Sequence, residues 1–512
     1  MRQCGRRRHR RRLGSRLPHV ADGLQLHRRE VLSLAASAIA FAACASGRRT
    51  ATPATVPTTA PFDSTRPWWL QGDFAPVTNE VEAFDLTVDG SLPAELAGLY
   101  VRNGSNPRTG VSPHWFFGDG MVHGIRLEHG RAVSYRNRYV RTPLYEASAG
   151  FGQGVPGGTN TQSNVSCIRN GRALLTSGEV GLPFQLSPDD LSTIGPFDFA
   201  GRLTTSMTAH PKVDPDTGLL HFFGYGFVPP YLTYHVASPD GQLLHSTEIP
   251  VPGATMIHDF AITDTDAVFW DLPVVFDLDA AVAYINNPGS AAFPFRWDPS
   301  YGARVGVLPL GADGAAVRWA SLDEPCYVFH GVNAFRTGSD VVVDVCRLSS
   351  MFDTTSANAL GGQLTLRRWT VSDGSARVRD EELVAADRDP GELPSRSPLF
   401  VGREHRYGYL VQSRRSPQTV DLGGVIKHDF RSGDRVTWDP GPTRHSGEWL
   451  FVPSPDGGNE DDGWLMTYVH DEATNESAFV VIDATDVAAG PVASIKLPQR
   501  VPYGFHATWM PA

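Results

Sequence analysis

Four histidines in this chain of 512 residues follow apolar or small residues and could together bind one metal ion. They are His210, His258, His330 and His506. Neutral imidazoles suit borderline transition metals, but the wide separation of these four matches no compact local metal motif. The residues alone therefore allow a four-histidine site without demonstrating one. Other histidines are expected to be structural or on the surface, among them His221, His235, His405, His445 and His470.

If the four imidazoles converge, the end of the chain must return to the middle of the molecule, which indicates a closed, ring-like fold. Short apolar segments recur along the chain, including 173–175, 219–223, 267–270, 341–343 and 478–482. Turn clusters separate them, including 214–218, 238–241, 372–374 and 431–434. This alternation predicts an all-β sandwich, barrel or propeller. No sequence repeat is visible, so only closure by His506 favours a propeller, and a barrel crossed by a terminal strand stays the alternative.

The composition supports an all-β protein and disfavours a nucleic-acid-binding one. The chain has 51 glycines and 39 prolines, with 10% aromatic and 20% charged residues, which is typical of strands joined by tight turns. A formal net charge of −10 argues against nucleic acid, whose binding depends on Lys and Arg neutralising phosphates. The five cysteines are scattered and indicate neither a zinc ribbon nor a disulfide scaffold. A single pairing of Cys326 with Cys346 stays open.

The N-terminal segment has the features of an export signal. A basic region precedes an apolar run from Val31 to Ala43, and the pair Arg28-Arg29 resembles a twin-arginine signal. This run is shorter than the roughly 20 residues that a membrane span needs. Cys44 resembles the cysteine of a bacterial lipoprotein box, so the exported protein is expected either free or lipid-anchored. We predict a signal peptide over 1–44, a Thr/Ala/Pro-rich linker over 45–66 and one folded domain over 67–512.

Several motifs between Trp68 and the C-terminus resemble the carotenoid cleavage oxygenases and occur in that family's order. They are Leu99 to Pro107, His114 to His123, Thr208 to Lys212, His258 to Phe260, Phe329 to Asn333, Arg406 to Tyr409, Glu460 to Trp464 and Gly504 to His506. The resemblance implies a seven-bladed β-propeller with a metal ion on its axis. It also implies a dome of loops and short helices over one face, which encloses a hydrophobic substrate tunnel.

The resemblance also implies a role for each candidate site residue. One Fe(2+) per chain would be held by His210, His258, His330 and His506, leaving two positions of an octahedron free. Three glutamates would accept hydrogen bonds from these ligands. The implied pairs are Glu179 with His258, Glu392 with His330 and Glu448 with His506, which leaves His210 without a glutamate. The candidates for the tunnel wall are Phe116, Phe117, Phe227 and Tyr231, while His114 and His123 are expected to be structural.

The expected activity is that of a non-haem Fe(II) dioxygenase, which cleaves a conjugated C=C bond of a carotenoid or apocarotenoid into two carbonyl products. One alternative is cleavage of a stilbenoid, and a more remote one is an exported propeller that binds a lipophilic ligand without turnover. In the stilbenoid-cleaving branch a lysine precedes the first glutamate, whereas this chain has Gly178, which favours the polyene. The expected partners are therefore a lipophilic polyene and O2. Contact with a membrane surface would come from a lipid anchor or an apolar tunnel mouth.

Overall fold

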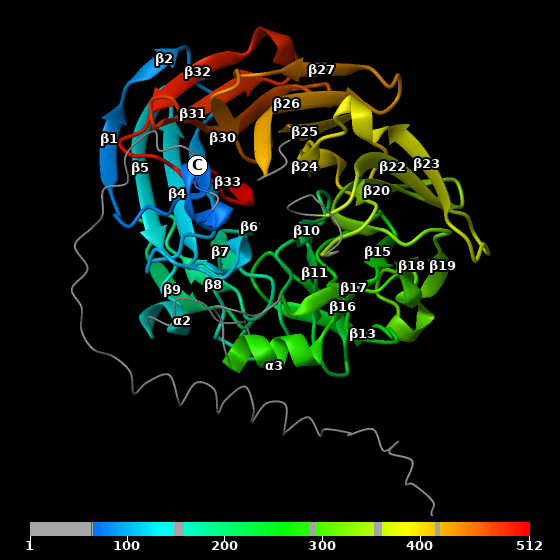
Figure 1. Ribbon diagram of the computed structural model, residues 1–512. Helices are drawn as coiled ribbons and strands as arrows, with labels where there is room; N and C mark the ends of the chain where they lie inside the picture. Colours follow the sequence, from blue (N-terminus) through cyan, green and yellow to red (C-terminus); the bar gives the residue numbers. More distant parts are fainter. Residues whose placement is uncertain (1–62, 64, 148–157, 287–292, 353–360, 415–419) are drawn as a thin grey trace, which may run out of the picture. The chain divides into compact units, whose positions relative to one another are not determined.

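The computed structural model describes residues 63, 65–147, 158–286, 293–352, 361–414 and 420–512, all within the unit Pro53–Ala512. The expected signal peptide and most of the expected linker therefore lie outside the described residues. The described chain forms seven sheets of four to six strands, arranged around one axis as a seven-bladed β-propeller (Figure 1). The prediction of an all-β propeller is confirmed, against the sandwich and the barrel.

Five blades are four-stranded antiparallel sheets. They are β6–β9 (Ser166–Asn170, Ala173–Ser177, Phe184–Leu186, Thr193–Pro196), β10–β13 (Lys212–Val213, Leu220–Tyr225, Leu232–Ala237, Leu243–Glu248), β14, β15, β18 and β19 (Phe260–Ile262, Asp266–Asp271, Arg304–Pro309, Arg318–Ser321), β20–β23 (Tyr327–Thr337, Asp340–Leu348, Leu364–Val371, Arg379–Val384) and β24–β27 (Glu392–Ser395, Tyr407–Arg414, Asp421–Asp429, Arg435–Trp438). The turn clusters expected from the sequence fall in their hairpins, because Gly, Asp and Ser supply the backbone conformations that tight turns need.

The other two blades combine strands from both ends of the folded unit. Their strand orders are β1-β5-β4-β3-β33 and β2-β32-β31-β30-β28, with β29 also paired to β30. The bounds are β1 Glu82–Leu86, β2 Val88–Gly90, β3 Gly98–Arg102, β4 Met121–Glu128, β5 Arg131–Tyr139, β28 Arg444–Ser446, β29 Leu450–Pro453, β30 Gly463–Asp471, β31 Glu476–Asp483, β32 Pro491–Lys496 and β33 Ala507–Pro511. Val101 of β3 pairs with Thr508 of β33, and Val88 of β2 pairs with Ile495 of β32. The ring is thus closed by two separate strand pairings.

Helical structure is sparse in the described residues. The α-helices are α2 (Pro143–Glu146) and α3 (Leu278–Asn286), and the 3-10 helices are η2 (Trp68–Leu70), η3 (Gly72–Phe74), η4 (Trp115–Phe117), η5 (Pro299–Tyr301), η6 (Gly314–Ala316), η7 (Ala386–Arg388), η8 (Pro398–Phe400) and η9 (Val487–Ala489). The helix α3 and the hairpin β16–β17 (Val274–Phe276, Phe295–Trp297) are inserted between β15 and β18. None of the described helices combines the length and the apolar character that crossing a bilayer requires.

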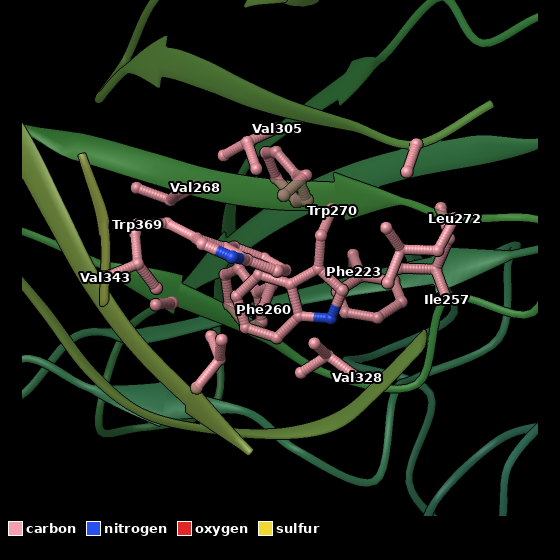
Figure 2. Close-up of a cluster of buried hydrophobic side chains, with 14 of the residues drawn as sticks. Phe223, Ile257, Phe260, Val268, Trp270, Leu272, Val305, Val328, Val343 and Trp369 are labelled. Carbon is pink, nitrogen blue, oxygen red and sulfur yellow. The ribbon is translucent and has the colours of Figure 1, made fainter. Parts of the chain in front are cut away.

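The largest buried apolar cluster lies between three neighbouring blades, β10–β13, β14 with its partners, and β20–β23. It packs around Trp270 of β15 (Figure 2). Ile257 and Val328 belong to this cluster and lie one and two residues before His258 and His330. Full burial of one such side chain contributes roughly 1.5–3 kcal/mol. The packing that holds these blades together therefore also fixes two of the histidine-bearing segments.

Candidate functional site

The four histidines singled out in the sequence converge at one point. Their metal-binding ring nitrogens lie within 4.8 Å of one another, and all four residues are buried. His210 and His258 each lie two residues before the first strand of a blade, β10 and β14. His330 lies inside β20, and His506 immediately precedes β33. Four blades thus contribute one imidazole each, and the Nε2 atoms of His210 and His258 are 2.9 Å apart.

Three glutamates hold three of these imidazoles through Nδ1. The distances are 2.8 Å from His258 Nδ1 to Glu179 Oε2, 2.7 Å from His330 Nδ1 to Glu392 Oε2 and 3.0 Å from His506 Nδ1 to Glu448 Oε1. Because an ionised carboxylate can only accept, Nδ1 is the donor in each pair, and Nε2 is the ring nitrogen that a cation could use. These are the three pairs that the family resemblance implied.

The glutamates are themselves held in place by the fold. Glu448 also accepts from Ala507 N at 2.8 Å, and Glu179 accepts from the hydroxyl of Tyr225 at 3.0 Å. Glu392 follows Gly391, whose φ of +79° and whose close approach to a neighbouring strand both require glycine. Each carboxylate is therefore oriented by a contact or a backbone turn beyond the histidine that it holds.

His210 differs from the other three. Among the described residues, no carboxylate contacts its ring. Its backbone N–H donates to Thr208 Oγ1 at 3.1 Å, and the Thr208 hydroxyl donates to the carbonyl of His258 at 3.3 Å. The segment that carries His210 is therefore positioned through its backbone, against the segment that carries His258.

The protonation of the cluster fits a bound cation. Burial and the neighbouring imidazoles lower the pKa of His210 and of His330 well below the usual value, so both rings are neutral. At His258 burial is outweighed by the charge of Glu179, and the net shift of its pKa is upward. Nε2 of His330 is buried without a hydrogen-bond partner in the described chain. A shared divalent transition metal would satisfy these lone pairs and would stand in place of a proton at His258.

The segment that leads to His506 is buried but is not a strand. Residues 501–506 belong to no strand, and β33 begins only after the histidine. Three amides of this segment donate to three different parts of the chain: Tyr503 N to Asp73 O at 3.0 Å, Phe505 N to Asn103 O at 2.9 Å and His506 N to Val165 O at 3.1 Å. The apolar pattern is explained by burial against several neighbours rather than by one strand ladder.

A cavity of about 720 Å³ lies beside the histidines, and His258, His330 and His506 line it. Much of its wall is aromatic: Trp115, Phe116, Phe117, Phe227, Phe293, Phe295, Phe329 and Phe505. Four of these residues belong to η4 and β17, which therefore form part of the cavity wall. The cavity can bury an apolar molecule beside the three histidines that line it.

Three of the four aromatic residues predicted for a tunnel wall, Phe116, Phe117 and Phe227, line this cavity. Tyr231 is not among the described lining residues, because it lies across the turn from Phe227, where its carbonyl accepts from Gly226 N at 2.9 Å. Sequence reasoning missed Phe329 and Phe505, although each immediately precedes a cluster histidine. That adjacency was the signal that could have found them.

Residues expected to be structural have partners away from the cluster. His114 Nδ1 accepts from Phe116 N at 3.2 Å, and His123 Nδ1 lies 2.8 Å from the hydroxyl of Tyr135. Cys326 and Cys346 are buried free thiols, which answers the open question of their pairing. Burial raises the pKa of Cys326 to about 11, so this thiol is not a reactive thiolate at neutral pH.

Comparisons with known proteins agree with this architecture. A family model described as "Retinal pigment epithelial membrane protein" matches residues 74–511. The carotenoid cleavage oxygenase of Mycobacterium tuberculosis is 36% identical, in an alignment that covers 86% of this chain and 97% of the relative. The carotenoid 9,10(9',10')-cleavage dioxygenase 1 of Arabidopsis thaliana is 35% identical, with 86% and 89% covered.

Among solved structures, the lignostilbene dioxygenase of Pseudomonas brassicacearum superposes with a TM-score of 0.79 at 28% identity. The match covers 89% of this chain and all of that structure. Agreement in sequence and in fold over nearly all the described residues shows that the chain belongs to the carotenoid cleavage oxygenases.

Proposed function

We propose that this protein is a non-haem Fe(II) dioxygenase that cleaves a conjugated C=C bond of a carotenoid or apocarotenoid. The observation that carries the proposal is a four-histidine cluster that borders an aromatic cavity of about 720 Å³. One oxygen atom of O2 would enter each of the two carbonyl products, so alkene and O2 together account for all product atoms. The names of the relatives from Mycobacterium tuberculosis and Arabidopsis thaliana support this reaction class.

The iron would be held by His210, His258, His330 and His506. When bound, ferrous iron supplies the one-electron and O2 chemistry that protein side chains cannot provide. The contribution of the chain is positional. Glutamate partners keep the imidazoles of His258, His330 and His506 in one orientation, and the aromatic wall holds an alkene beside the cluster and excludes water from it. The proposal needs no separate acid or base.

The residue before Glu179 supports a polyene over a phenol. A Cβ atom on Gly178 would lie 2.8 Å from Thr161 Oγ1 and 3.2 Å from Ser163 N, so a lysine does not fit there without displacing these groups. The hydroxyl of Tyr225 already donates to Glu179, at 3.0 Å. Affinity would then come mainly from buried apolar area, at roughly 25 cal/mol per Å². A long polyene buries more of this area than a two-ring stilbene.

A stilbenoid is the second candidate substrate. It is favoured by the structural likeness to the lignostilbene dioxygenase and by one polar group in the cavity wall. Gln162 lines the cavity, and its Nε2 is buried without a hydrogen-bond partner among the described residues. This amide could donate to a phenolic or carbonyl oxygen.

The test is turnover by purified, iron-loaded protein on a panel of carotenoids, apocarotenoids and 4-hydroxystilbenes under ¹⁸O2. We expect cleavage of a carotenoid or apocarotenoid, little dependence on a 4-hydroxyl group, and one labelled oxygen in each carbonyl product. Rapid turnover of 4-hydroxystilbenes without cleavage of any carotenoid would overturn the substrate assignment. Iron-loaded protein that turns over no member of the panel would instead favour a lipophilic-ligand-binding propeller.

We also propose that residues 1–44 direct export, with lipidation of Cys44 as the route to membrane attachment. The support is the arginine pair and the short apolar run of the sequence. Changing Arg28 and Arg29 to Lys should trap precursor in the cytoplasm, and unchanged processing would argue for a different route. If Cys44 is lipidated, Cys44→Ala should release the protein from membranes.

A further inference from the structure

Asp259 directly follows a cluster histidine, His258, and its side chain is buried. Its oxygens accept three hydrogen bonds. Oδ1 accepts from Lys212 Nζ at 2.6 Å and from Phe260 N at 2.7 Å, and Oδ2 accepts from Gly331 N at 2.9 Å. Because Lys212 and Gly331 belong to two other blades, one buried carboxylate joins three blades of the ring.

Each of these contacts lies within two residues of a cluster histidine. Lys212 follows His210 by two residues, and Gly331 directly follows His330. The ladder between β20 and β21 shifts register on both sides of Gly331, and such irregularities re-aim side chains locally. A Cβ on Gly331 would lie 2.8 Å from the ring of Trp270, so glycine allows the close packing that presents this N–H to Asp259.

We propose that the Lys212–Asp259 pair is a positioning device that sets the spacing of the segments carrying His210, His258 and His330. It thereby sets the geometry of the metal centre. Neither residue touches the reacting atoms, so both are positioning residues rather than catalytic ones. The inference rests on the four-histidine metal site of the proposed function, and it is independent of the substrate.

The Lys212–Asp259 pair constrains direction more than it adds stability. The side chains of Lys212 and Asp259 are 13% and 2% exposed, and a buried ion pair is often no more stabilising than an apolar pair of the same volume. An apolar pair, however, would exert no directional constraint. A carboxylate that accepts from three donors on three segments fixes their relative placement. This constraint also explains His210, which has no carboxylate on its ring in the described structure but lies two residues from Lys212.

The chain contains a matched control. Lys427 of β26 pairs with Asp461 at the same distance, 2.6 Å, with side chains 11% and 17% exposed. This pair belongs to none of the segments that carry the four histidines. It therefore reports what the loss of a buried Lys–Asp pair does to stability alone.

The experiment compares two double variants, Lys212→Met/Asp259→Asn and Lys427→Met/Asp461→Asn. Each removes one positive and one negative charge, so the net charge is unchanged. The probe is Co(II), and the readouts are its dissociation constant by chelator competition, its visible absorption spectrum and the Tm of the metal-free protein. We expect the first variant to weaken Co(II) binding about tenfold and to shift the spectrum. The second should lower Tm comparably and leave both metal readouts at the wild-type values.

The inference would be overturned if Lys212→Met/Asp259→Asn folds and keeps the wild-type Co(II) affinity and spectrum. It would also be overturned if Lys427→Met/Asp461→Asn changes these two metal readouts by the same amount. If the first variant does not accumulate as folded protein, Asp259→Glu decides, because it keeps the charge and moves the carboxylate by one methylene. A shifted Co(II) spectrum would then support positioning, and an unchanged one would refute it. These readouts need no substrate, so a failed cleavage assay leaves them valid. Lack of Co(II) binding by wild-type protein would refute the metal site itself.

Discussion

Glutamine substitutions at the carboxylates behind the cluster should weaken metal binding unequally, and Glu448→Gln most. Glu448 uses both oxygens, one for His506 Nδ1 at 3.0 Å and the other for Ala507 N at 2.8 Å. The glutamine amide has one acceptor oxygen and one NH2 donor. Either His506 Nδ1–H or Ala507 N–H must then face the NH2 group, at a residue that is only 9% exposed. Loss of such a hydrogen bond to a charged group costs about 1.5–3 kcal/mol. Because each 1.4 kcal/mol changes a dissociation constant tenfold, the metal dissociation constant should increase about 10- to 100-fold.

Glu392→Gln should have the smaller effect. Its Oε2 accepts from His330 Nδ1 at 2.7 Å and also from Leu393 N, whereas Oε1 is buried without a partner in the described chain. A glutamine can therefore keep its carbonyl oxygen on both donors and turn its NH2 to the unpartnered side. No two donors are forced together, so we expect the metal affinity to fall about tenfold. This is the lower end of the range for groups that orient metal ligands.

The assay is chelator competition for Co(II) or Fe(II), with the Tm of the metal-free protein as the control for folding. We expect Glu448→Gln to bind the metal more weakly than Glu392→Gln, with both variants folded. Equal losses, or a larger loss at Glu392, would refute the argument from acceptor geometry. Wild-type affinity in both would show that neither carboxylate supports the metal.

Three further predictions follow from other parts of the structure. His506→Ala should abolish retention of iron through gel filtration, and full occupancy would remove this residue from the site. Gly178→Lys should lower Tm, because its Cβ would lie 2.8 Å from Thr161 Oγ1, and should not create 4-hydroxystilbene cleavage; an equally stable variant would contradict this. Although burial raises the pKa of Asp429, hydrogen bonds from Arg406 and two backbone amides outweigh it and hold that pKa at about 2. The stabilisation that ionised Asp429 contributes is present above the unfolded pKa near 3.8 and is lost as the pH falls towards 2. Because its partner Arg406 is 42% exposed and solvent screens the pair, Asp429→Asn should cost about 1 kcal/mol at pH 7 and much less at pH 2 in urea unfolding.

Local patterns were sufficient to predict strands and turns. The apolar run 267–270 lies within β15, and the cluster 431–434 forms the turn between β26 and β27, because both depend on neighbouring residues only. The glutamate–histidine pairs could not be obtained in this way. Glu392 and His330 are 62 residues apart and meet because consecutive blades lie side by side. Only resemblance to a known family supplied these pairs in advance.

Features that depend on three-dimensional register were not predictable. Nothing in the sequence around Tyr231 indicates that it lies outside the cavity wall while Phe227 lies within it, because the turn between them decides which one enters. The links from Asp259 to Lys212 and Gly331 depend on three blades meeting at one point. The pairing of β2 with β32 likewise involves strands at opposite ends of the folded unit.

The pairing of β33 with β3 has a consequence for biosynthesis. The first three cluster histidines leave the ribosome long before His506, which reaches the others only when β33 adds to a strand made near the start of the domain. Contacts this distant in sequence form late, because the entropy of closing a long loop must be overcome first. A nascent chain can therefore offer a metal ion three imidazoles but never four. Tight retention of the metal would mark a ring that has closed, and a chain stalled before β33 would exchange its metal with the surroundings.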